Sequence, residues 1–231
     1  LILKARKEFE YKINGVSKSL EDFKEYILYE KILLKQVYSR RDKSMISERK
    51  TTSVAVQNMI KNCSQNPEVW QVAAAWYAND RNDLNAALKI VNKGLTIHKN
   101  SKLLYTEAIK LELSAIKGNN RLEDDEEAQR KVCKKIETYV LFICDCINDS
   151  NYLIEILNLL ATYSFTTSVQ NLLIDKLLQN HSDMEFVWHT LAQREKREEA
   201  SNDKYLTERY YIKWLELVTD EEALRILERD G

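Results

Sequence analysis

Glycine and proline are scarce in this sequence: the 231 residues include 4 Gly and 1 Pro. β-Sheet proteins use many tight turns, and those turns need residues that accept a positive φ or preset the backbone. Rossmann and P-loop folds need glycines where the backbone approaches a phosphate group. The scarcity excludes both classes and favours an all-α fold.

An excess of charge of one sign is also absent. The chain has 35 Lys and Arg against 36 Asp and Glu, a formal net charge of −1. Dedicated nucleic-acid binders draw much of their affinity from basic side chains that neutralise phosphates. A local basic face remains open, but the chain as a whole does not have the composition of an RNA binder. No apolar run approaches the ~20 residues of a membrane span.

The few cysteines lack the spacing of a metal site or a redox motif. Cys63, Cys133, Cys144 and Cys146 form no CxxC pair and fall within helical patterns. We expect buried, reduced thiols of an intracellular protein rather than disulfides or zinc ligands. No signal peptide is visible, and the start at Leu1 without Met suggests a piece of a longer protein.

Apolar residues recur at helical spacing along the whole chain. With 44% hydrophobic and 31% charged residues, the chain is expected to fold. The predicted helices are 20–41, one that ends near residue 60, 68–78, 84–97, 102–116, about 123–147, 152–163, 168–179, 184–197 and 206–218. Helices of about ten to fifteen residues with short breaks are typical of stacked helical hairpins.

A frame of three residues recurs inside these helices: an aromatic residue, an apolar or aromatic residue three positions on, and Glu at seven. It occurs as Phe23-Tyr26-Glu30, Tyr105-Ala108-Glu112 and Trp188-Leu191-Glu195, and as Trp70-Ala73-Tyr77 without the acid. This spacing puts the three side chains on one face of a helix. A catalytic group occurs once, whereas a packing device recurs in each unit. We therefore predict that each Glu bonds a polar group of a neighbouring helix.

The frame also gives a repeat length. Trp70 and Tyr105 are 35 residues apart, which suits a repeat of two helices. The helix between them carries the small residues Ala87 and Gly94, which let two helix backbones approach closely.

These features resemble the HAT (half-a-TPR) repeat family, whose first helix carries W-x-x-Y-x-x-x-E and whose second carries A-R-x-I-[FY]-E-R-A-L before a proline. Trp70, Tyr105 and Trp188 match the first helix. The second-helix matches are Ala87, Ile90, Val91, Gly94 and Leu95, and Asn100 stands where the proline is common. The resemblance implies an α-solenoid of HAT hairpins, a family found mainly in RNA-processing assemblies.

A more specific likeness lies at the N-terminus. The residues that carry it are Phe9-Glu10-Tyr11-Lys12-Ile13, Glu21-Asp22-Phe23, Tyr26, Tyr29-Glu30, Leu33-Leu34 and Arg40-Arg41. This run is similar to the family of the sixth U-three small nucleolar RNA-associated protein, the HAT subunit of the UTP-B subcomplex of the small-subunit processome. The likeness continues over 70–113 and 188–195, with no catalytic motif among the matches.

The sequence departs from that family pattern in one place. Phe23 and Trp70 are 47 residues apart, whereas two repeat steps need roughly 70. We predict an N-terminal helical segment with the first HAT helix over 1–50 and a HAT-repeat array over 51–231. Between them, near Lys50-Thr51, the chain is either internally shortened or lacks a segment, and the family pattern continues beyond Gly231.

No constellation of catalytic, metal-binding or cofactor-binding residues emerges. His98 and His181 fall at predicted helix ends, where capping is expected, and His189 follows Trp188 without a partner at metal-site spacing. We expect a protein that is not an enzyme and has no cofactor or metal.

Two basic clusters are the candidate contacts for RNA or an acidic partner. They are Lys35, Arg40, Arg41 and Lys43, and Arg130, Lys131, Lys134 and Lys135. Solvated surface is the competing interpretation for both clusters. The acidic run 123–127 precedes the second cluster and suits the start of a helix.

The family resemblance implies a nucleolar scaffold that supports pre-rRNA processing and assembly of the small ribosomal subunit. Its implied partners are other UTP-B subunits, which are β-propeller proteins, with small nucleolar RNA and pre-rRNA contacted indirectly. No membrane and no small-molecule substrate are implied. Two alternatives remain open: a HAT scaffold of pre-mRNA splicing or 3′-end processing, and a solenoid that binds RNA directly.

Overall fold

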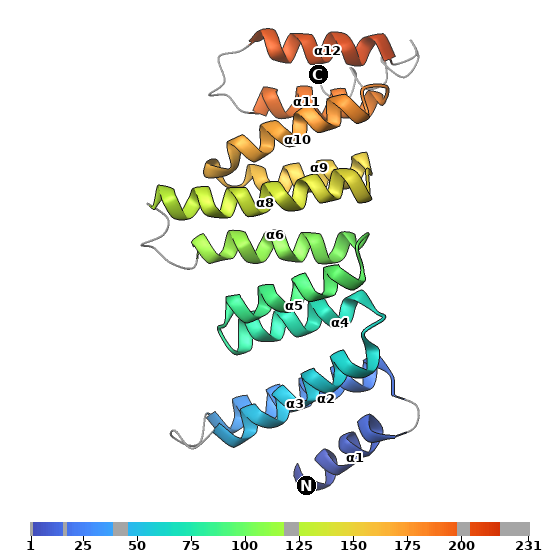
Figure 1. Ribbon diagram of the computed structural model, residues 1–231, viewed down its shortest axis with the longest axis vertical. Helices are drawn as coiled ribbons and strands as arrows, with labels where there is room; N and C mark the ends of the chain where they lie inside the picture. The colour runs from blue at the N-terminus through green and yellow to red at the C-terminus, as the bar shows by residue number, and fades with distance from the viewer. Residues whose placement is uncertain (1, 16–17, 39–45, 118–124, 198–203, 218–231) are drawn as a thin grey trace. The chain divides into compact units, whose positions relative to one another are not determined.

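The protein is all-helical wherever its structure is described. The computed structural model describes residues 2–15, 18–38, 46–117, 125–197 and 204–217, and every regular element in these ranges is a helix (Figure 1). The all-α prediction is therefore confirmed for this part of the chain. The chain divides into two compact units, Leu1–Ala115 and Ile116–Gly231, and each is described by itself.

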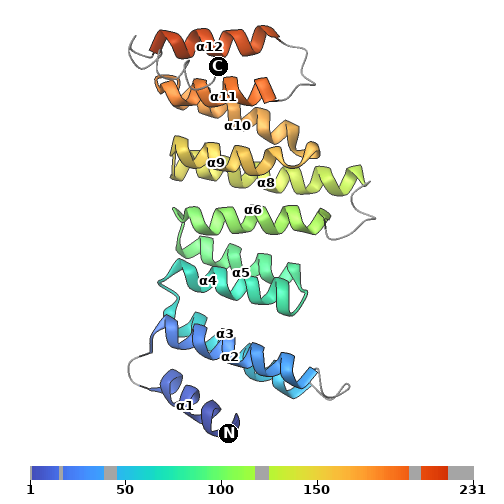
Figure 2. The same ribbon diagram turned by 180° about the vertical axis from the view of Figure 1, so that it is seen from behind.

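The first unit is a series of antiparallel helices. Its elements are α1 (Ile2–Asn14), α2 (Leu20–Tyr38), α3 (Ile46–Cys63), α4 (Pro67–Ala75), η1 (Trp76–Asp80), α5 (Leu84–Ile97) and most of α6 (Lys102–Lys117). α2 packs on α3 and α4 packs on α5, while α1 lies on α2 (Figures 1 and 2). Phe23, Tyr26, Val56, Met59 and Trp76 meet in one buried cluster.

The second unit repeats this arrangement. Its elements are α8 (Glu126–Cys146), α9 (Ser150–Ala161), η2 (Ser164–Thr166), α10 (Thr167–Asn180), α11 (Glu185–Arg197) and α12 (Lys204–Leu217). α10 packs on α8 and α9, and α11 packs on α12. Ile136, Ile143, Leu153, Ile156 and Leu157 are among its fully buried side chains.

Short polar side chains start the helices. Asn66, Asp83, Asp125 and Asp149 each precede a helix, and each side-chain oxygen accepts a hydrogen bond from a backbone N–H of the first turn. Such caps satisfy donors that have no partner within the helix. Pro67 occupies the first helical position, where the backbone N–H that proline lacks would have no partner within the helix.

Asparagine supplies backbone conformations that many proteins assign to glycine. Asn82 and Asn148 have φ of 54° and 45°, and each directly precedes a capping Asp. Asn tolerates this left-handed region better than other non-glycine residues, because its short side chain bonds locally. The chain can therefore make sharp breaks between helices with very little glycine.

A π-helical turn ends the fourth helix. The sequence predicts a helix over 68–78 and a turn at 79–83, but residues Trp76–Asp80 continue α4 as a π-helix. The prediction is wrong for Asn79 and Asp80, because helix periodicity does not distinguish a wider turn from an α-helical one. The Asp83 N–H closes the turn by donating to the Tyr77 carbonyl oxygen at 2.9 Å.

The other helices lie close to their predicted ranges, and α5 runs over 84–97 as predicted. The helix expected to end near residue 60 is α3, which ends at Cys63 and begins at Ile46. The predicted division near Lys50-Thr51 falls inside this continuous helix. Whether family positions are absent there stays a prediction.

Candidate functional site

The recurring Glu of the sequence frame forms a buried ion pair in its first occurrence. Glu30, on α2, is fully buried, and Arg6 of α1 donates to both of its carboxylate oxygens. The Nε–Oε1 distance is 2.7 Å and the Nη2–Oε2 distance is 2.6 Å. This two-pronged geometry is among the strongest that a carboxylate forms. The predicted bond to a neighbouring helix is present at Glu30.

The aromatic members of that frame lie in the core beside this ion pair. Phe23 and Tyr26 are buried, and Tyr26 stacks on Phe9 of α1 with ring centroids 6.0 Å apart. Burial first, and then the negative charge of Glu30, raises the pKa of Tyr26 to about 12. The frame thus fixes α1 on α2 through stacked rings and a charge pair.

The fourth and fifth helices approach closely at the predicted small residue. A Cβ atom on Gly94 would lie 2.7 Å from Cγ and 2.8 Å from Cβ of Trp70. Trp70 is buried and its Nε1 donates to the Ser64 carbonyl oxygen at 3.0 Å. Ala87 is fully buried on the same helix as Gly94. The predicted role of small residues in a close helix approach holds at Gly94.

The frame at the C-terminal end repeats one of these contacts. Trp188 Nε1 donates to the Ser182 carbonyl oxygen at 2.8 Å, again six residues back along the chain. Trp188 is only half-buried, and its ring lies 6.0 Å from that of Tyr210. Glu195 lies 3.8 Å from Nη1 of the adjacent Arg194, whose Nη2 donates to Gln170 at 2.6 Å.

The remaining frame members are deeply buried. Tyr105 is 5% exposed and Glu112 is 2% exposed. A carboxylate this far from water has a structural role. Leaving such a buried charge without a partner would cost on the order of 3 to 5 kcal/mol. The frame residues Tyr105 and Glu112 therefore lie inside the first unit.

Two histidines end helices, as the sequence predicts. His98 caps α5 and His181 caps α10. His98 Nε2 lies 2.9 Å from the Ser64 carbonyl oxygen, and His181 Nε2 lies 3.1 Å from Asn148 Oδ1. Each imidazole thus joins a helix end to a loop about one repeat earlier in the chain.

The cysteines are free thiols, but not all are buried. Cys144 is buried, Cys63 and Cys133 are half-buried, and Cys146 is exposed. The prediction is wrong for Cys146 because it lies two residues after Cys144 and so faces away from the apolar side of α8. Burial raises the pKa of the Cys133 and Cys144 thiols, which keeps them protonated. Among the described residues, no three metal-binding side chains come together.

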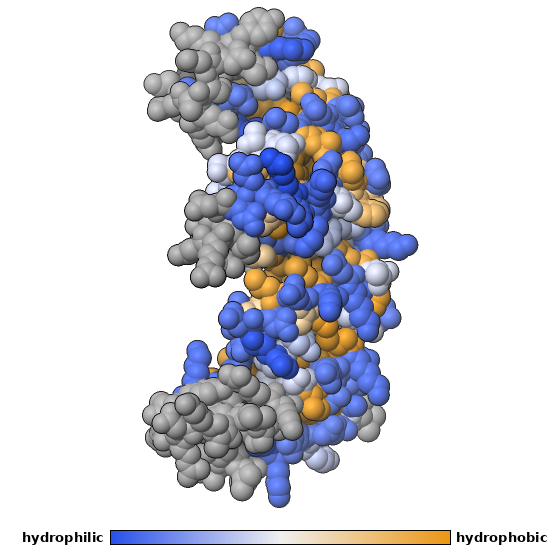
Figure 3. Space-filling view, turned by 60° about the vertical axis from the view of Figure 1, so that its left-hand side comes forward, coloured by the Kyte–Doolittle hydropathy of each residue, from blue (hydrophilic) through white to orange (hydrophobic). Residues whose placement is uncertain are grey.

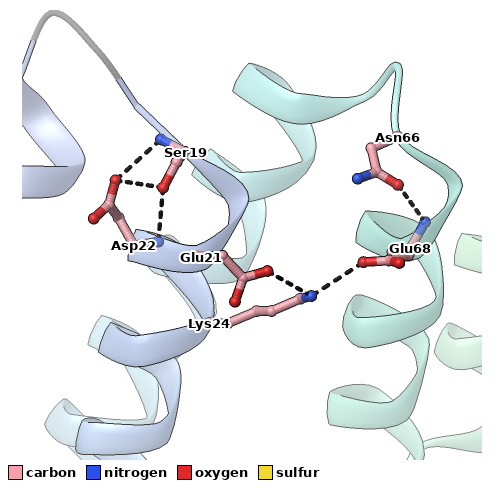
Figure 4. A network of polar contacts seen from close by, with 6 residues as sticks. All are labelled: Ser19, Glu21, Asp22, Lys24, Asn66 and Glu68. Carbon is pink, nitrogen blue, oxygen red and sulfur yellow. Dashed lines mark hydrogen bonds and ion pairs between the residues drawn. The ribbon is translucent and has the colours of Figure 1, made fainter.

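Ion pairs near the surface join α2 to α4, and hydrogen bonds cap the start of α2. Lys24 Nζ lies 3.0 Å from a Glu21 carboxylate oxygen and 3.1 Å from one of Glu68 (Figure 4). Ser19 and Asp22 form a reciprocal cap, and the Ser19 hydroxyl is the main cause of the lowered pKa of Asp22. Exposed pairs of this kind contribute little stability, so the network orients helices and is not a reactive site.

The basic clusters are only partly brought together by the fold. Arg40, Arg41 and Lys43 lie outside the described residues, and Lys35 is exposed on α2. In the second cluster, Arg130 pairs with Glu126 at 2.9 Å and Lys131 pairs with Glu127 at 2.6 Å. Lys134 and Lys135 are exposed. The acidic residues one turn earlier therefore neutralise half of this cluster.

Sequence reasoning missed two features. Arg6 was not singled out, because its role depends on α1 packing against α2 rather than on any local pattern. The other is a groove over α4 with Tyr77 at its surface. The signal for this groove was the loss of the acid in the Trp70 frame, where Tyr77 takes its place.

Comparison with known proteins finds a family that the N-terminal part of the chain resembles. The sequence model of the family described as U3 small nucleolar RNA-associated protein 6 matches residues 1–62, which hold α1, α2 and almost all of α3. The chain resembles this family. The matched segment contains the run from Phe9 to Arg41 that carried the resemblance and the Arg6–Glu30 pair.

A human relative extends the likeness beyond that segment. The U3 small nucleolar RNA-associated protein 6 homolog of Homo sapiens is 22% identical over 261 aligned residues, which cover 89% of this chain and 44% of the relative. The chain therefore spans less than half the length of that protein. The alignment is longer than the 231-residue chain, so it includes positions of the relative that this chain lacks. No helix in the described ranges is long and apolar enough to span a bilayer.

Proposed function

We propose that the chain is a scaffold subunit of the small-subunit processome, within its UTP-B subcomplex. In this role it supports nucleolar pre-rRNA processing and small-subunit assembly through contacts with other proteins. The observation that carries the proposal is the family match over residues 1–62. Small nucleolar RNA and pre-rRNA are contacted indirectly, through the other subunits.

The proposal includes HAT repeats as the structural unit. Two features support a repeat of this kind. α4 and α6 begin 35 residues apart, as do α9 and α11. In addition, Trp70 and Trp188 each donate to a serine carbonyl oxygen six residues back. A contact that recurs at one place in a repeating pair of helices is what stacked repeats produce.

The proposal of a non-enzymatic role rests on how the acids of the frame are used. Arg6 donates hydrogen bonds to both carboxylate oxygens of Glu30, and Glu30 has no access to water. A general acid or base needs to reach a substrate proton, which this geometry prevents. Its role is to fix α1 on α2, and that fits a scaffold whose outer surfaces bind partners.

Affinity purification of the tagged protein with mass spectrometry tests the function. We expect recovery of UTP-B subunits, mostly β-propeller proteins, and nucleolar localisation of the tag. As a matched pair, Arg6→Met should weaken this recovery by loosening α1, whereas Lys110→Glu, on the exposed face of α6, should leave it unchanged. Recovery of splicing or 3′-end processing factors in their place, with nucleoplasmic staining, would overturn the proposal.

A further inference from the structure

A groove opens on the first unit between α3 and α5, above α4. It has a volume of about 490 Å³. Its apolar walls are Ile60 of α3 and Ile90 and Ile97 of α5, and its floor includes Trp70. Ile97 is 45% exposed, so part of its apolar surface is open to a partner. Apolar patches of this kind lie among the polar side chains on the surface in Figure 3.

The groove lies where the repeat frame is broken. In the frames of α2 and α6 the seventh position is a buried acid, Glu30 or Glu112. In the Trp70 frame this position is Tyr77, which lines the groove. The π-helical turn begins at Trp76, so the backbone is widened at this point. Single π-turns within helices are often associated with functional sites.

The charged side chains that line the groove are both basic. Lys61 of α3 and Lys93 of α5 lie on opposite walls and are exposed, and no Asp or Glu is among the lining residues. Neither ammonium group has an ion-pair partner in the described part of the chain. The nearby acid of the π-turn, Asp80, is already paired with Lys31 of α2 at 2.6 Å. Two unpaired cations thus flank an apolar floor.

The apolar floor and the two lysines together indicate which kind of partner the groove can bind. An apolar floor with aromatic side chains favours an aliphatic or aromatic anchor, because burying it removes apolar surface from water. Two lysines on opposite walls favour carboxylates on both sides of that anchor. A single-stranded nucleic acid fits less well, because a stacking platform would expose several aromatic faces, whereas of the two aromatic lining residues Trp70 is buried and Tyr77 is half-buried.

We propose that this groove is a docking site for an acidic peptide segment of a partner protein, anchored by an apolar side chain between Ile60, Ile90 and Ile97. The inference rests on the proposed scaffold function and gives the chemical class of one partner. Because it is tested with the purified chain alone, its failure would leave the result of the affinity purification unchanged.

Selection of phage-displayed random dodecapeptides on the full 231-residue chain tests the inference. We expect the enriched peptides to share Asp or Glu on both sides of one or two aliphatic or aromatic residues. A synthetic peptide of the enriched sequence, followed by fluorescence anisotropy, should lose affinity about tenfold or more when Lys61→Glu and Lys93→Glu are combined. Ile97→Ser should weaken it as well, because the anchor loses a wall of its pocket.

The matched control is Lys7→Glu combined with Lys110→Glu. These lysines are exposed in the same unit and do not line the groove, so this variant changes the net charge equally. It should bind the peptide as the wild type does, and far-UV circular dichroism should show that all variants fold. The proposal is overturned by enrichment of basic or uncharged peptides, by no enrichment, or by equal losses in the control. Binding of polyuridine that only the groove variants lose, without acidic peptide binding, would also overturn it.

Discussion

At the scale of single residues, the two partners of the Arg6–Glu30 pair differ in their access to water. The Arg6 side chain is 20% exposed, whereas that of Glu30 is fully buried. A guanidinium that loses its partner can turn towards solvent, but a carboxylate in the core cannot. The loss of stability should therefore depend on which of the two residues is replaced.

Arg6→Met should lower the free energy of unfolding by about 2 to 4 kcal/mol, because it removes the ion-pair partner of the buried Glu30 charge. Glu30→Gln should cost less, about 1 kcal/mol, because the remaining Arg6 is partly hydrated and the neutral amide keeps the shape of the site. Urea denaturation followed by circular dichroism measures both values. Equal costs for the two variants would contradict this account of the pair.

Tyr26 gives the first unit a dependence on alkaline pH. An unfolded Tyr26 loses its proton near pH 10, whereas its folded pKa is about 12. Between these values the folded state binds more protons than the unfolded state, so the free energy of unfolding falls as pH rises. Below about pH 10 this contribution is fully present.

The Tyr26→Phe variant tests this dependence. We expect a shallower fall of the urea midpoint between about pH 10 and pH 12 than in the wild type. Tyr11→Phe is the matched control, because the Tyr11 ring is 83% exposed and meets solvent in both states. A slope for Tyr26→Phe that equals the wild-type slope would show that Glu30 and burial do not hold the Tyr26 proton.

At the scale of helices, α4 and α5 pack closely against each other at Gly94. Gly94→Ala would place a methyl group 2.7 Å from Trp70 Cγ, and the second contact, to Trp70 Cβ, leaves no rotamer that relieves it. Overpacking of this kind costs about 1 to 3 kcal/mol. The higher helix propensity of Ala returns somewhat less than 1 kcal/mol.

We therefore expect Gly94→Ala to lower the free energy of unfolding by about 1 kcal/mol, measured by urea denaturation. Lys89→Ala, at an exposed position of the same helix, should change it by less than about 0.5 kcal/mol. An unchanged or increased stability of Gly94→Ala would mean that the two helices separate without cost.

Helices whose limits depend on local chemistry could be predicted from the sequence. The limits of α5 follow from Asp83 at its start and from its apolar stripe, and the start of α4 follows from Asn66-Pro67. The π-turn at Trp76–Asp80 could not be predicted, because a widened turn keeps the same sequence of apolar positions. Arg6 was missed because it acts across two helices, and the Tyr77 groove because a cavity depends on how three helices pack.

At the scale of the whole molecule, the distribution of charge determines the affinity of the chain for nucleic acid. The formal net charge is −1, and in the second basic cluster Glu126 and Glu127 pair with Arg130 and Lys131. These two ion pairs reduce the positive charge that the second basic cluster offers to RNA phosphates. A steep dependence of affinity on salt requires many phosphate contacts, which this distribution does not offer.

Single-stranded RNA should therefore bind the purified chain no more tightly than about 10⁻⁵ M at physiological salt. Fluorescence anisotropy with a labelled oligonucleotide should show a shallow decline in affinity from about 50 mM to about 200 mM salt. Neutralising Arg40, Arg41, Lys134 and Lys135 together should change the affinity little. If binding were tight and steeply salt-dependent, and if that dependence vanished in this variant, direct RNA binding would replace the scaffold role. Because the same variant leaves the Lys61 and Lys93 groove intact, peptide binding should persist in it, and the two modes of recognition can be separated in one protein.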